Sequence, residues 1–138
     1  MNKARVTPEN IVSLREYEVF VFGSNLSGRH GKGAAKTALG WGAKWGQASG
    51  LQGKTYGIPT KSHDVRSVLP IHDIKTYVNI FIEFAKMRPN ITFLVTEIGC
   101  GLAGYKPKDI APLFKGAITV ENIHLPGRFW HKIKNVNP

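Results

Sequence analysis

The fold class follows from one stretch of sequence, ITFLVTEIGCGLAGY, at residues 91–105. Residues 91–96 are a continuous apolar run, the pattern of a strand that is buried on both faces of a parallel sheet. Residues 99–105 are rich in glycine, and a helical pattern begins shortly afterwards at Pro107. Strand, glycine-rich loop and helix in this order predict an α/β protein, in which ligands bind beyond the carboxyl ends of the strands.

An earlier segment has the same arrangement. The apolar residues 19–22 predict a buried strand, and the loop GSNLSGRHGKGAA follows at residues 23–35. Glycines let backbone N–H groups approach phosphate oxygens, and the start of the next helix favours negative charge. Two such loops on two strands of one small sheet indicate a ligand with two phosphates.

Strands alternate with helices along the rest of the chain, which predicts a mostly parallel sheet with helices on both faces. Further strands are expected at residues 55–58 and 120–125, and helices at residues 7–14, 33–45, 70–87 and 107–114. Residues 46–53 are predicted to be a loop, and residues 59–68 an exposed loop after Pro59 stops its strand. The sequence leaves open whether the basic, aromatic tail at residues 128–138 packs back onto the domain or frays.

Length and composition predict one domain over residues 1–138, with 42% hydrophobic and 20% charged residues. No apolar stretch approaches the roughly 20 residues that span a membrane. No apolar segment that could serve as a signal peptide follows the first five residues. The single cysteine, Cys100, excludes an internal disulfide and fits a reducing compartment. We therefore expect a cytoplasmic protein without a membrane partner.

The net charge of +10 predicts attraction to polyanions such as nucleic acid, nucleotides or acidic proteins. Three interpretations stay open: a solvated basic surface, contact with nucleic acid as the main function, and a field that attracts a small anionic ligand. Trp41 and Trp45 are predicted to pack between a helix and the sheet, or else to stack on a base. His30 is expected either to contact phosphate or to be solvated.

Two nucleotide-binding fingerprints are absent from the glycine loops. Neither loop ends in Gly-Lys-Ser/Thr, which excludes the phosphate loop of nucleotide triphosphatases. Residues 31–36 have Lys36 at the third glycine position of the dinucleotide fingerprint, and the acidic ribose partner is missing, which disfavours an NAD(P)-dependent oxidoreductase. The histidines lack metal-ligand spacing, so we expect neither a metal nor a cofactor.

Four short segments carry a family resemblance: GKGAA at residues 31–35, IPTK at 58–61, IGCGL at 98–102 and NIHL at 122–125. In order and approximate spacing they resemble the macrodomain family, which binds ADP-ribose, and most of all its branch with the terminal ADP-ribose protein glycohydrolase. The IGCGL segment matches that branch letter for letter. A similar combination occurs in small phage-encoded proteins. The resemblance implies a three-layer α/β/α fold around a central mixed, mostly parallel sheet.

The resemblance also implies positions for the ligand. The residues that would contact it are Asn25, Gly31, Gly33, Ala34, Gly99, Cys100, Gly101, Leu102, Ala103, Gly104 and Tyr105. The first loop would cradle the phosphates and distal ribose, and the second would cover the diphosphate. Tyr105 follows the second loop and is expected to stack on a sugar or on adenine.

Lys61 falls on the catalytic lysine of that branch, which attacks the anomeric carbon of the ribose. Ala103 stands where the branch has its catalytic aspartate, so Asp64, Asp109 and Glu97 are candidates to replace it. We expect binding of ADP-ribose or a related NAD-derived diphosphate nucleotide, free or attached to a protein or small molecule. Hydrolysis of acyl-linked ADP-ribose through Lys61 stays open, and nucleic-acid binding is the alternative.

Overall fold

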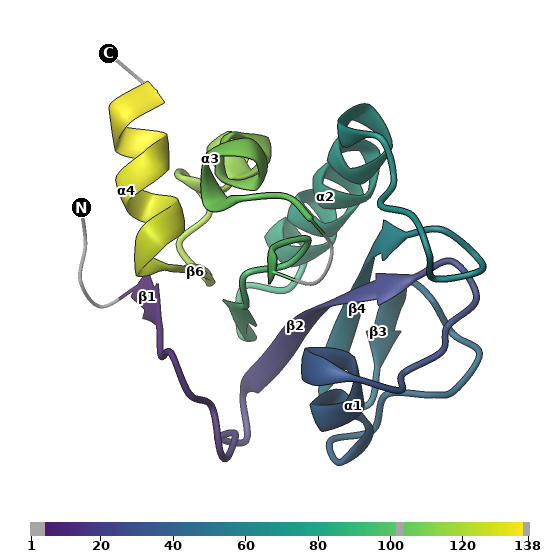
Figure 1. Ribbon diagram of the computed structural model, residues 1–138. Helices are drawn as coiled ribbons and strands as arrows, with labels where there is room; N and C mark the ends of the chain where they lie inside the picture. The colour runs from purple at the N-terminus through teal and green to yellow at the C-terminus, as the bar shows by residue number, and fades with distance from the viewer. Residues whose placement is uncertain (1–4, 102–103, 137–138) are drawn as a thin grey trace.

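A six-stranded sheet forms the centre of the molecule, with strand order β1-β6-β5-β2-β4-β3. The computed structural model describes residues 5–101 and 104–136. The strands are β1 (Val6–Thr7), β2 (Glu18–Asn25), β3 (Gly50–Gln52), β4 (Thr55–Lys61), β5 (Thr92–Val95) and β6 (Ile123–Pro126). Neighbouring strands are parallel except β3 and β4, which are antiparallel. The predicted mixed, mostly parallel α/β fold is confirmed (Figure 1).

Helices cover both faces of this sheet, which gives three layers. The helices are α1 (Gly33–Leu39), α2 (Ile71–Lys86), α3 (Pro107–Ile110), the 3₁₀ helix η3 (Ala111–Ala117) and α4 (Gly127–Val136). Successive side chains of a strand point to opposite faces. Val19 and Val21 of β2 therefore join the larger core, under α2, η3 and α4, whereas Phe20 and Phe22 pack on the other face with α1.

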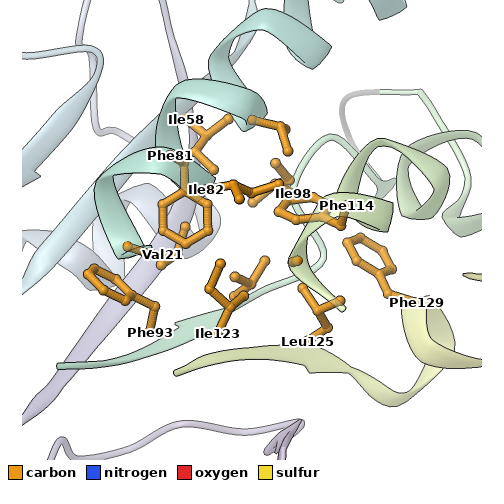
Figure 2. Close-up of a cluster of buried hydrophobic side chains, with 14 of the residues drawn as sticks. Val21, Ile58, Phe81, Ile82, Phe93, Ile98, Phe114, Ile123, Leu125 and Phe129 are labelled. Carbon is orange, nitrogen blue, oxygen red and sulfur yellow. The ribbon is translucent and has the colours of Figure 1, made fainter. Parts of the chain in front are cut away.

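Helix α2 confirms the prediction for residues 70–87. Its buried side chains recur at helical spacing and are Ile74, Val78, Phe81, Ile82 and Ala85. Figure 2 shows Phe81 and Ile82 above Phe93 and Ile123 of the sheet, and the Phe81 and Phe93 rings meet edge to face with centroids 5.4 Å apart. Burial of this apolar face holds the helix against the sheet.

The predicted helix at residues 7–14 is wrong. Val6 and Thr7 form strand β1, which pairs with Leu125 and Pro126 of β6, and no helix or strand follows before β2. The guanidinium of Arg5 explains the difference, because it donates hydrogen bonds of 2.8–3.1 Å to four backbone carbonyls between residues 117 and 123. These distant contacts override the local helix-start signal.

Three boundaries between residues 33 and 61 also differ from the prediction. Helix α1 ends at Leu39 rather than continuing to residue 45, because Gly42 adopts a φ of +107°. The predicted loop at residues 46–53 contains β3, and β4 runs through Pro59 to Lys61. Pro59 is tolerated because β3 pairs only with residues 55–57, so its missing N–H is not needed on that side.

The basic tail is helix α4 over residues 127–136, and it packs back onto the domain. Phe129 and Ile133 are buried in the larger core. The indole N–H of Trp130 donates to the Arg5 carbonyl at 2.8 Å, and the Arg5 guanidinium lies 4.9 Å from the indole centroid. Across residues 5–101 and 104–136, no helix is long and apolar enough to cross a membrane.

Candidate functional site

A cleft of about 430 Å³ lies where β2, β4 and β5 end, and both glycine loops line it. Its volume is within the range of about 300–1,000 Å³ that is typical of small-molecule sites. The predicted residues that line it are Asn25, Gly31, Gly33, Ala34, Lys61, Gly99 and Cys100. Seven predicted positions from three separate segments are therefore brought together in one hollow.

Asn25, the last residue of β2, organises the first loop. Its side-chain amide donates to the Arg29 carbonyl at 2.7 Å, and its oxygen accepts from the Ser27 hydroxyl at 2.8 Å and the Arg29 N–H at 2.9 Å. The buried side chain is thus occupied within the loop. It shapes the wall of the cleft.

The glycines of the first loop leave room in the cleft. A Cβ atom added at Gly31 or Gly33 would meet no atom within 4 Å, and Gly33 has a φ of +58°. In the second loop Gly99 has a φ of +71°, and its Cβ would lie 3.0 Å from the Ile110 side chain. The backbone of the two loops therefore faces open space at Gly31 and Gly33 and is packed tightly at Gly99.

Of the remaining predicted residues of the second loop, Gly101, Gly104 and Tyr105 do not line the cleft. Gly101 and Gly104 adopt positive φ angles of 70° and 92°. The Tyr105 hydroxyl donates to the Leu69 carbonyl at 2.7 Å, and its ring packs against the larger core. Leu102 and Ala103 lie outside the described residues.

Glu97 is the candidate carboxylate that reaches the cleft. It receives two hydrogen bonds from the Arg128 guanidinium, at 2.6 and 2.7 Å. Asp109 instead accepts the Lys106 N–H at 3.0 Å at the start of α3. Asp64 accepts the Ser62 hydroxyl at 2.6 Å and the Arg66 N–H at 3.0 Å, and these bonds lower its pKa.

Cys100 lines the cleft as a protonated thiol. Burial, with a smaller effect of the Glu97 carboxylate, raises its pKa to about 11. Since the thiolate is the nucleophilic form of cysteine, this side chain is not a nucleophile at neutral pH.

Further lining residues that the sequence did not assign to the site include Arg29, Trp45 and Val65. Trp45 was placed on a helix, but α1 ends before it, and 64% of its side chain is exposed. His30 is neither solvated nor on the lining of the cleft. It is fully buried, and its Nε2 donates to the Lys44 carbonyl at 2.8 Å.

A second hollow of about 720 Å³ adjoins the first, and the two share Ala34, Thr96 and Glu97. Its lining includes Thr7, Glu9, Asn10, Phe20 and Arg128. The Thr7 hydroxyl is buried and has no hydrogen-bond partner among the described residues. The sequence missed this hollow because residues 6–7 form strand β1 and residues 8–11 continue from it without forming the predicted helix.

The two hollows differ in charge. Arg29, Lys32 and Lys61 line the first, against the single carboxylate of Glu97. The second has two carboxylates, Glu9 and Glu97, and one cation, Arg128. Phosphate is therefore favoured in the first hollow. In the part of the chain that the structure describes, no group of three or more histidine, cysteine, aspartate or glutamate side chains could hold a metal ion.

Comparison with known proteins adds a likeness of fold. No protein-family model and no curated protein matches the chain. A solved structure described as a protein of unknown function from Bacteroides thetaiotaomicron superposes with a TM-score of 0.60 and 15% identity. The match covers 83% of this chain and 88% of that one. Similarity at this level of sequence identity shows a shared fold and does not indicate a function.

Proposed function

We propose that this protein binds ADP-ribose or a related NAD-derived diphosphate nucleotide in the cleft between its two glycine loops. The observation that carries the proposal is the shared lining: Gly31 and Gly33 of one loop and Gly99 of the other border one hollow. The open space at Gly31 and Gly33 lets a phosphate approach the backbone closely. The three cations of the same hollow supply attraction for the diphosphate.

The base of the nucleotide fits the second hollow in this proposal. Phe20 contributes an apolar ring to the lining there, and the Glu9 and Asn10 side chains offer hydrogen bonds. The ligand would then extend from the acidic hollow, past Glu97, to the basic one.

Hydrolysis is a second candidate function, favoured by the presence of Lys61 in the cleft. The Lys61 amine would attack the anomeric carbon of an acyl-linked ribose, and the carboxylate would leave. Water would then cleave the lysine–ribose bond and restore the amine. A carboxylate is a good leaving group, so this step needs no residue at the position of Ala103 to protonate it.

Calorimetric titration with ADP-ribose tests the binding proposal, with wild-type protein and two variants that each add one negative charge. Gly31→Glu places a carboxylate in the cleft without a steric clash, since a side chain there meets open space. Asn79→Glu is the matched control, because Asn79 is exposed on α2 and lies outside both hollows. We expect micromolar binding by the wild type and the control, and at least tenfold weaker binding by Gly31→Glu. No binding by the wild type refutes the proposal.

A salt titration separates this function from nucleic-acid binding. Each phosphate contact with DNA releases counterions, so affinity for nucleic acid falls steeply with ionic strength. A diphosphate held partly by backbone groups in a cleft should lose much less affinity over the same range. Tight, strongly salt-dependent binding to oligonucleotides together with no binding of ADP-ribose would favour the alternative function.

A further inference from the structure

An exposed tryptophan lies on the lining of the cleft. The Trp45 side chain is 64% exposed, whereas Trp130 is buried and Trp41 packs edge to face on Phe20 at 5.0 Å between centroids. An exposed indole on the lining of a hollow offers an aromatic ring to a planar group of a ligand. Trp45 lines the first hollow and not the second.

Neighbouring residues hold the Trp45 side chain in place. Its ring meets the buried imidazole of His30 edge to face, with centroids 6.3 Å apart, and that imidazole in turn contacts Phe22 at 5.2 Å. The backbone on either side is also held: the Lys44 N–H donates to the Gln52 side chain at 2.7 Å, and the Gly46 N–H donates to the Gly28 carbonyl at 2.9 Å. The indole is therefore oriented before any ligand arrives, which lowers the entropic cost of a contact.

Val65 is a second apolar residue on the lining of the same cleft. It lies between β4 and α2 in the chain, whereas Trp45 lies between α1 and β3. Val65 has a φ of 59°, which is unusual for a β-branched residue. Its loop is closed by hydrogen bonds from the Val65 N–H to the Ser62 carbonyl and from the Ser62 N–H to the Ser67 carbonyl. The fold holds this apolar side chain at the cleft despite the strain.

We propose that Trp45 and Val65 bind a planar, uncharged ring that the ligand carries beyond its diphosphate, on the distal ribose. The inference rests on the proposed function and narrows its ligand class to molecules longer than ADP-ribose. A planar ring stacks on an indole face and buries apolar area against a branched aliphatic side chain. An uncharged ring fits better than a cationic one because Arg29 and Lys61 line the same hollow.

The test compares two probes that differ by such a ring: ADP-ribose, and NADH, whose reduced nicotinamide is uncharged. Both are titrated into the wild type, Trp45→Ala, Trp45→Phe and Tyr17→Ala. Tyr17 is an exposed aromatic residue outside both hollows and serves as the control. Thermal melts of all four proteins show that they are folded.

We expect the wild type to bind NADH more tightly than ADP-ribose. Trp45→Ala should lose about tenfold in NADH affinity, as for removal of one stacking partner, and keep its affinity for ADP-ribose within twofold. Trp45→Phe should retain most of the NADH affinity, and Tyr17→Ala should match the wild type. Equal effects of Trp45→Ala on the two probes, or none on either, would overturn the ring site while leaving ADP-ribose binding intact. Failure of the wild type to bind either probe would overturn the proposed function itself.

Discussion

Gly28 fixes the first glycine loop against the segment that carries Trp45, so Gly28→Ala should destabilise the protein. Gly28 has a φ of +70°. A Cβ atom there would lie 2.6 Å from the Gln47 nitrogen and 2.8 Å from the Gly46 Cα. Both are backbone atoms, which cannot rotate away as a flexible side chain could. The Gly46 N–H also donates to the Gly28 carbonyl at 2.9 Å, so the two segments cannot separate without losing that bond.

The magnitude follows from two costs. An alanine in the left-handed region costs roughly 1–2 kcal/mol, and relief of the backbone clash costs roughly 1–3 kcal/mol more. We therefore expect the free energy of unfolding to fall by about 3 kcal/mol, which corresponds to a decrease in Tm of roughly 10 °C for a chain of this size.

The assay is equilibrium urea unfolding, supported by thermal melts, with Gly31→Ala as the control in the same loop. A Cβ atom added at Gly31 would meet no atom within 4 Å, and Gly31 has no positive φ. The free energy of unfolding of the Gly31→Ala protein should therefore stay within about 0.5 kcal/mol of the wild-type value. A Gly28→Ala protein as stable as the control would refute the close packing of residue 28 against residues 46 and 47. A loss of similar size in both variants would show that the whole loop is intolerant of side chains.

Four further outcomes are expected. The Asn122 amide donates at 3.0 Å to three backbone carbonyls of α2 and the turn after it, so Asn122→Asp should lower the free energy of unfolding by about 2 kcal/mol in urea titrations, and Asn90→Asp should not. The pKa of Cys100, raised to about 11, predicts slow alkylation by iodoacetamide at pH 7.5 in the folded protein and fast alkylation in denaturant; a fast native reaction would contradict it. The same raised pKa means that the unfolded thiol ionises first, so Cys100 should make the protein less stable as the pH rises from 9 towards 11, an effect absent in Cys100→Ser. Finally, Lys61→Met should abolish any release of ADP-ribose from an acyl-linked substrate, whereas undiminished release would exclude Lys61 as the nucleophile.

Local patterns were sufficient for the elements at the centre of the fold. Strand β5 is a continuous apolar run, and α2 repeats its apolar side chains at helical spacing, so each shows its structure within a few residues. The two glycine loops could be assigned to one end of the sheet for the same reason, since both follow such strands. That reasoning brought Gly31 and Gly99 to one cleft, and the family resemblance added Lys61; the structure has all three on its lining.

The parts of the site that the sequence did not predict depend on the paths of the loops beyond the ends of the strands. Trp45 was predicted on a helix, and only the early end of α1 places it at the cleft. Val65 lies in a loop whose course is set by hydrogen bonds between its own ends. Tyr105 was expected to contact the ligand, but its hydroxyl donates a hydrogen bond to the Leu69 carbonyl instead. None of these outcomes has a periodic signal in the sequence.

The sequence by itself determined the α/β class, the central strands and the two loops at their carboxyl ends, because apolar periodicity and glycine content act over a few neighbouring residues. Tertiary structure alone decided that residues 6–7 join the sheet and that residues 127–136 form a packed helix. Arg5 stabilises both choices through carbonyls more than 110 positions away and through Trp130. Such bonds form only after the sheet has brought the two ends of the chain together. Their stabilising effect therefore cannot be predicted from the pattern of neighbouring residues in the sequence.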